Sequence, residues 1–180
     1  MSDEPCILFL RGVNVGAHRK LPMAELRALL GGLGLADVKT HIQSGNAVFR
    51  DPEGRADLAA AITSAIGDAF PFTPDAMLLR LSDLDAVLAA NPYAVEGRRD
   101  GARVHLGFLG RPSAADPRTL DALATDRERW TLTDAAFYLH LPDGLGSSKL
   151  ATQAERVLKV PMTLRNQRVA EAVADLARAL

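Results

Sequence analysis

The stretch CILFLRGVNVG, residues 6–16, decides the fold. Its first five residues are apolar at successive positions, which is typical of a strand that is buried on both faces. The next six residues place Arg11 and Asn14 among glycines, where such a strand would end. A guanidinium and an amide are unusual at the end of a buried strand. The elements predicted for the rest of the chain suggest why they are there.

The segment after this strand has the pattern of a split βαβ unit. Apolar residues at helical spacing predict a helix over residues 22–33, and alternation predicts a strand over 38–42. SGN then makes a tight turn into a returning strand. A helix, a strand and a short helix that Ser82 would cap complete this half; the predicted elements cover residues 55–70, 77–81 and 82–91.

The second half repeats this order of elements without convincing residue identity to the first. A strand over 104–108 is followed by a helix that opens at Asp116 and by a second hairpin. Ser147 would cap the next helix, and Asn166 the last one. We therefore predict an α+β fold of two duplicated ferredoxin-like halves with antiparallel sheets that pack together. The predicted parts are residues 1–92, a linker over 93–102, and residues 103–180.

The predicted topology suggests a role for the polar residues that follow the first strand. A ferredoxin-like sheet has the strand order 4-1-3-2, so the ends of strands one and two and the start of strand three share one edge. The two polar loops should meet there, just before the positive N-terminal end of helix 22–33. His18 and Arg19 also precede that helix. The expected ligand-binding residues at this edge are Arg11, Asn14, Gly16, Lys20, Gln43, Ser44, Gly45 and Asn46.

A purely structural reading of the same residues is also open. Arg11 could pair with Asp37 or Asp51, and Asn14 and Asn46 could occupy turn positions that tolerate left-handed backbone. For each residue alone we favour this reading. For the convergent set we favour a binding site, because turns do not require four polar side chains at one strand edge.

The segment PDGLGSSKL, residues 142–150, is a second candidate. Glycines, serines and a lysine at the start of a helix supply flexible backbone, hydroxyl donors and a cation, which together can bind a phosphate group. The spacing of the Walker A motif is absent. The alternative is a glycine turn with Ser147 as N-cap, and we favour that reading. The residues here that could join the first edge, if the halves pack head to tail, are Ser148, Lys149, Arg165 and Asn166.

The sequence names no reaction. The four histidines are scattered without ligand spacing, so we expect no metal and no cofactor. Cys6 lies in an apolar strand and is better explained by packing than by nucleophilic chemistry. Ser44 is not in a nucleophile elbow. Whether the protein is an enzyme stays open, and a catalytic base near the first edge would have to be His41 or His18.

Composition narrows the function classes. The chain has 180 residues and a net charge of −1, from 21 basic and 22 acidic residues. Aromatic residues make up 5%, which argues against a nucleic-acid module with stacking aromatics. A lone cysteine, and no apolar run near the roughly 20 residues that span a bilayer, predict a cytoplasmic protein without a membrane partner. The oligomeric state is not indicated.

Several motifs, in order, resemble one bacterial family. LRGVNVG, HIQSGNAVF, YLHLPDGLGSSKL and LRNQRV are similar to the signatures of a family catalogued as a domain of unknown function, number 1697, over residues 7–170. The resemblance implies a duplicated ferredoxin-like architecture and no known activity. It also shows a departure, because that family usually has Trp after the RN pair, where this chain has Gln167. If that Trp stacks on a ligand, stacking is weakened here.

The leading functional hypothesis is therefore a site for a small anionic or phosphorylated ligand, nucleotides included, at the edge formed by LRGVNVG and QSGN. Lys149 or Arg165 of the second half would contribute to it. The alternatives are a nucleic-acid-binding module and a regulatory or assembly domain without catalysis.

Overall fold

A computed structural model describes residues 4–16 and 18–180. The chain forms two compact units. Unit 1 comprises the chain up to Asp85 together with Ala172–Leu180, and unit 2 comprises Ala86–Glu171. The chain passes from one unit to the other inside α3 (Leu81–Ala89) and returns inside α7 (Gln167–Arg178).

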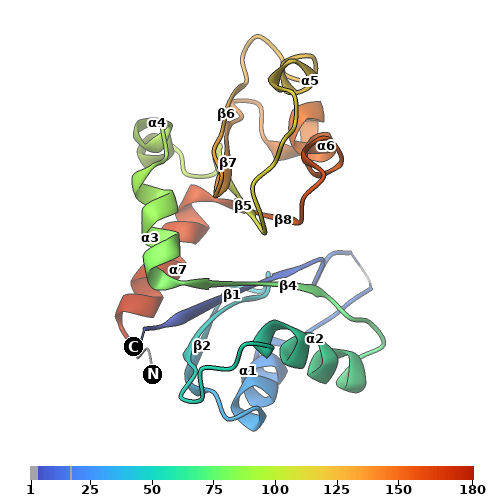
Figure 1. The fold of residues 1–180 in the computed structure, drawn as a ribbon, viewed down its shortest axis with the longest axis vertical. Coiled ribbons are helices and arrows are strands. Elements are labelled where there is room, and N and C mark those ends of the chain that lie inside the picture. Colours follow the sequence, from blue (N-terminus) through green and yellow to red (C-terminus); the bar gives the residue numbers. More distant parts are fainter. Residues whose placement is uncertain (1–3, 17) are drawn as a thin grey trace. The chain divides into compact units, whose positions relative to one another are not determined.

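Unit 1 is built on a four-stranded sheet with the order β2-β3-β1-β4, in which all neighbours are antiparallel (Figure 1). This is the predicted order of a ferredoxin-like half. Its elements are β1 (Cys6–Arg11), α1 (Met23–Gly32), β2 (Ala36–His41), β3 (Asn46–Arg50), α2 (Leu58–Ala69) and β4 (Asp75–Arg80).

The core of unit 1 lies between the two helices and one face of this sheet. Leu26 and Leu30 of α1 and Ile62 of α2 pack in one cluster with alternate residues of β1. The residues between them on β1, Ile7 and Phe9, are also fully buried. Both faces of β1 are therefore buried, as the apolar run predicts.

Unit 2 repeats the arrangement with the sheet order β6-β7-β5-β8. Its helices α5 and α6 contact each other, and Leu120, Leu150 and Leu158 pack in one core cluster with Phe137 and Leu139 of the sheet. The duplicated ferredoxin-like fold is confirmed. The elements are α4 (Ala94–Arg99), β5 (Val104–Leu109), α5 (Pro117–Asp121), β6 (Arg129–Leu132), β7 (Ala136–His140), the 3₁₀ turn η1 (Leu145–Ser147), α6 (Lys149–Leu158) and β8 (Met162–Asn166).

The short helix α4 lies inside the segment 93–102 that the sequence presents as a linker. Polar and aromatic contacts, rather than an apolar stripe, hold it in place. Glu96 pairs with Arg129 of β6, whose guanidinium lies 5.0 Å from the ring centre of Tyr93. The Tyr93 hydroxyl is 3.0 Å from Oγ1 of Thr131.

Of the three predicted helix caps, that of Asn166 is confirmed, and Asp116, where a helix is predicted to open, is also a cap. Asp116 Oδ1 accepts a hydrogen bond from the Arg118 amide at 3.0 Å, and Asn166 Oδ1 accepts one from the Val169 amide at 2.9 Å. Both satisfy an amide in the first turn of a helix, which has no partner within the helix itself.

The other two predicted caps, Ser82 and Ser147, are wrong. The Ser82 amide lies inside α3 and donates to Glu4 Oε1 at 2.7 Å. Ser147 belongs to η1, where its hydroxyl donates to the carbonyl of Asp143 at 3.1 Å. The next serine, Ser148, caps α6 by accepting from the Ala151 amide at 3.0 Å.

No helix among residues 4–16 and 18–180 is long and apolar enough to cross a membrane.

The adjacent serines give a matched test of this cap. Ser148→Ala should lower the free energy of unfolding by about 1 kcal/mol, because a buried hydroxyl and a first-turn amide lose their hydrogen bond. Ser147→Ala removes an exposed hydroxyl and should cost less than about 0.5 kcal/mol. Urea unfolding of both variants measures the difference. Equal losses would contradict the assignment of the cap.

Candidate functional site

Three segments of unit 1 meet at one end of its sheet. Asn46, the first residue of β3, is the register partner of both Phe9 in β1 and His41 in β2. The backbone amide of Leu10 donates to the carbonyl of Gly45 at 2.8 Å. The loop after β1 and the turn before β3 are therefore neighbours, as the topology predicts.

Asn14 ties these segments together through its side chain. Nδ2 donates to the carbonyls of Leu21, at 2.9 Å, and Gln43, at 2.6 Å, while Oδ1 accepts from the Leu21 amide at 2.8 Å. Its φ of 54° lies in the left-handed region that asparagine tolerates. Both amide hydrogens are used inside the protein, so Asn14 braces the loops.

The turn before β3 is equally constrained. Asn46 is fully buried, and its Nδ2 donates to the His41 carbonyl at 3.1 Å and to Ser44 Oγ at 2.8 Å. At Gly45, with φ of 75°, an added Cβ would lie 2.6 Å from Val13 Cγ2 and 2.7 Å from Leu10 Cβ. Only glycine fits there, because the turn is pressed against the loop that follows β1.

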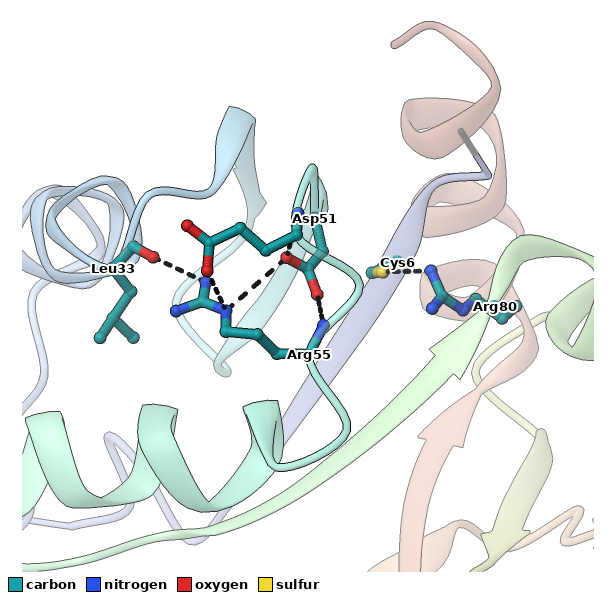
Figure 2. Close-up of polar contacts among 6 residues, drawn as sticks. Cys6, Leu33, Asp51, Arg55 and Arg80 are labelled. Carbon is teal, nitrogen blue, oxygen red and sulfur yellow. Dashed lines mark hydrogen bonds and ion pairs between the residues drawn. The ribbon is translucent and has the colours of Figure 1, made fainter. Parts of the chain in front are cut away.

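Arg11 is exposed and faces Asp75 across the β1–β4 pair. The two acids considered as its partners hold other arginines. Asp37 Oδ2 lies 3.6 Å from Arg50 Nε. Asp51 belongs to the opposite end of the sheet, where its Oδ2 accepts from the Arg55 backbone amide at 2.7 Å (Figure 2).

Figure 2 also shows Cys6 at that opposite end, beside Arg80. The thiol is 4% exposed, and Arg80 Nη1 lies 2.9 Å from its sulfur. Burial raises the pKa of Cys6, although the Arg80 charge acts in the other direction. A thiol with a raised pKa is a poor nucleophile at neutral pH, which supports the packing role.

A cavity of about 550 Å³ opens in unit 1, lined by His18, Arg19, Lys20, Pro71 and Phe72. It lies near the braced loops, because Asn14 bonds to Leu21 and the segment holding Phe72 leads into β4 beside Arg11. The sequence pointed to Lys20 and its neighbours. Phe72 and Pro71 were missed, because a proline that stops a helix gives no signal of lining a cavity.

Arg19 forms a wall of this cavity. Its guanidinium carbon lies 5.3 Å from the Phe72 ring centre, and Nη2 donates to the Thr73 carbonyl at 3.0 Å. All three basic residues, His18, Arg19 and Lys20, are exposed. Gly16 and Gln43 are exposed on the loops nearby, and Ser44, whose Oγ accepts from Asn46, is half-buried.

In unit 2 the predicted residues lie at one end of the second sheet. His140, which precedes the 142–148 loop, pairs with Val104, and Asn166 pairs with the next residue, His105. Ser148 is buried as the α6 cap, while Lys149 is exposed. The expectation that this set joins the unit 1 edge stays a prediction.

Arg165 of β8 is half-buried in unit 2. Its Nη1 donates to the Leu164 carbonyl at 2.9 Å and lies 3.2 Å from Thr163 Oγ1. Burial lowers the pKa of Arg165 to about 10, because the charged form loses hydration. The guanidinium still carries its charge at neutral pH.

Gln167 is an interior residue. The family whose signatures this sequence resembles usually has Trp at this position. Asn91 Nδ2 donates to its Oε1 at 2.9 Å, and its Nε2 donates to Glu171 Oε1 at 2.7 Å. A Cβ added at Gly97 would lie 1.7 Å from Oε1. The position is enclosed by α4 and the amide network, so the side chain here packs and hydrogen-bonds inside unit 2.

No group of three or more histidine, cysteine, aspartate or glutamate side chains in the described parts of the chain could hold a metal ion. His105 is a separate buried group, 6% exposed, and its Nδ1 has no hydrogen-bond partner among the described residues. Burial, reinforced by the charge of Arg103, lowers the pKa of His105 from 6.5 to about 4.

His105 should make stability depend on pH. The unfolded chain takes up a proton below about 6.5, whereas the folded protein takes it up only near 4, so stability falls as the pH is lowered through this window. The full loss is about 3 kcal/mol. His105→Leu should make the curve of unfolding free energy against pH, from urea titrations, flatter by a comparable amount. An unchanged curve would contradict a neutral buried imidazole.

Gly45 and Gly54 form a second matched pair, since both have positive φ but only Gly45 lacks room for a Cβ. Gly45→Ala should lower the free energy of unfolding by about 3 kcal/mol, from strained backbone and overpacking together. Gly54→Ala should cost about 1 kcal/mol, from the backbone alone. Chemical denaturation measures both, and equal costs would rule out the close approach of the turn to Leu10 and Val13.

The fold and motifs have counterparts among known proteins. The structure of the conserved bacterial protein SP0830 from Streptococcus pneumoniae is similar to this chain, with a TM-score of 0.69 and 26% sequence identity. The similarity covers 97% of this chain and 98% of that one. No curated protein matches the sequence. The model of a family described as protein of unknown function (DUF1697) matches residues 4–138, and the chain belongs to that family.

Proposed function

We propose that the end of the unit 1 sheet near Asn14 binds a small anionic or phosphorylated ligand. The observation that carries the proposal is the cavity of about 550 Å³ lined by three consecutive basic residues, His18, Arg19 and Lys20. Its volume falls in the range of small-molecule sites, about 300–1,000 Å³. The described residues that line it include no acid, so its charge favours an anion.

The lining also suggests how the ligand would lie. Lys20 and His18 are exposed and can approach an anionic group from the solvent side. Pro71 and Phe72 offer an apolar surface to the rest of the molecule, and aromatic side chains stack well on flat rings. A nucleotide, which joins a flat ring to a phosphate, is one member of this class.

The residues named from the sequence take different parts in this proposal. Asn14, Gly45 and Asn46 have structural roles, since their amides and close contacts hold the loops together. They would act indirectly, because Asn14 fixes Leu21 and so the neighbouring Lys20. Lys20 is the residue expected to touch the ligand.

Thermal melting with inorganic phosphate, glucose 6-phosphate, AMP and acetyl phosphate tests this function. A compound present at about 100 times its Kd stabilises the folded state by about 2.7 kcal/mol and should raise the Tm by about 5 to 10 °C. Lys20→Gln and His18→Gln should reduce that shift while leaving the Tm of the free protein nearly unchanged, because both side chains are exposed.

Arg99→Gln is the matched control, since it removes an exposed cation from α4 in the other unit. It should leave the ligand-induced shift intact. The proposal fails if no compound changes the Tm, or if Lys20→Gln and Arg99→Gln respond to the ligand alike.

A specific observation also favours an assembly domain as a second candidate. Val15 and Ile42 are 67% and 52% exposed on neighbouring loops at this end of the sheet. Ile42 has φ of 48°, and a β-branched residue in the left-handed region is a genuine outlier. Strain of this kind persists where surrounding structure enforces it, and it often accompanies function.

Ile42→Asn separates strain from assembly. Asparagine tolerates left-handed backbone, so the variant should raise the free energy of unfolding by about 1 kcal/mol. If the two side chains form a protein interface, the same change should reduce self-association in concentration-dependent light scattering. A wild-type protein that stays monomeric at all concentrations would remove self-assembly from consideration.

A further inference from the structure

Unit 2 contains a second cavity that none of the preceding motifs involves. It has a volume of about 650 Å³ and lies between the segment after β5 and the C-terminal end of α6. Three basic residues line it, Arg111, Arg156 and Lys159. Much of the remaining wall is apolar and includes Pro112, Val157 and Val160.

The acidic residue among the described lining residues, Asp116, forms an ion pair with Arg118. Arg118 Nη2 donates to Asp116 Oδ2 at 2.7 Å, and Nε lies within hydrogen-bond distance of both carboxylate oxygens. These hydrogen bonds hold the pKa of Asp116 below its usual value. The charge that the cavity presents therefore comes from the three basic side chains.

Cations are also common at helix C-termini, where they interact with exposed carbonyls. Here two such carbonyls have partners of their own. Ser113 Oγ donates to the Leu158 carbonyl at 2.7 Å, and Arg111 Nη2 donates to the Lys159 carbonyl at 3.0 Å. Arg156 Nη2 donates to Gln153 Oε1 at 2.5 Å, and both Arg156 and Lys159 are exposed at the cavity.

Lys159 has a backbone conformation that lysine seldom adopts. It is the C-cap of α6, with φ of 54°, where glycine or asparagine is usual because a Cβ is strained. A lysine at this position keeps a cation beside the cavity at the expense of local backbone strain.

We propose that this cavity binds a small organic anion, with a carboxylate or phosphate group attached to an apolar body. The anionic group would lie between Arg156 and Lys159, and the apolar body against Val157, Val160 and Pro112. The site is separate from that of the proposed function, because all its lining residues belong to unit 2.

Titration of the full ¹⁵N-labelled chain with octanoate and with octyl phosphate, followed by NMR, tests the proposal. Both probes should shift the amide signals of residues 111, 113–116 and 156–160, with Kd values at least tenfold lower than those of acetate and methyl phosphate. The neutral 1-octanol should bind more weakly than either octyl anion. A site near residues 18–20 would give a different set of shifts, so the outcomes for the two cavities can be distinguished.

Variants that remove one charge each should weaken octanoate binding by about two- to fivefold, because a single exposed ion pair usually changes an affinity by about that factor. Arg156→Gln removes one of these charges. Lys159→Asn removes another and introduces a residue that tolerates the left-handed backbone at this position. Arg127→Gln is the control, because Arg127 is an exposed cation of unit 2 that pairs with Asp143 outside the cavity.

The proposal is overturned if neither octyl anion shifts these signals at millimolar concentration, or if the shifts map elsewhere. It is also overturned if the double variant Arg156→Gln, Lys159→Asn binds octanoate as tightly as Arg127→Gln does. A preserved melting temperature in the double variant would show that weaker binding does not come from unfolding.

Discussion

The side-chain amide of Asn14 holds together the end of unit 1 on which the candidate site depends. Its hydrogen bonds to Leu21 and Gln43 join the loop after β1, the entry to α1 and the turn before β3. Without it, the amide and carbonyl of buried Leu21 and the carbonyl of Gln43, which is 29 residues from Asn14, would each need another partner. The braced loops in turn fix the backbone next to Lys20, which lines the basic cavity.

The sequence was sufficient to predict most of the architecture. Apolar periodicity located the strands and the longer helices, and the split βαβ order then required Arg11 through Gly16 to lie beside Gln43 through Asn46. Topology determines which backbone segments become neighbours, because strand order follows from few rules. It does not determine which hydrogen bonds a side chain makes, so the sequence left open whether Asn14 and Asn46 bind a ligand or hold the loops as turn residues.

Features held by contacts between distant residues could not be predicted. Helix α4 has no apolar stripe from which to predict it, and contacts of Glu96 and Tyr93 with Arg129 and Thr131 of β6 hold it in place. Ser147 and Ser148 are chemically identical, and only the packed position of α6 decides that Ser148 is the cap. Phe72 reaches the cavity by the path of a loop between α2 and β4, for which a single sequence carries no periodic signal.

Unit 1 is discontinuous in sequence, and this affects the order in which it can form. Residues up to Asp85 supply its sheet and main helices, but Ala172–Leu180 also belong to it. Arg178 pairs with Asp85, and Lys39 Nζ donates to the Ala179 carbonyl at 3.2 Å. Because a ribosome makes the chain from its N-terminus, unit 1 must wait for the synthesis of the whole of unit 2 before these contacts can close. The part made first is thus the part completed last.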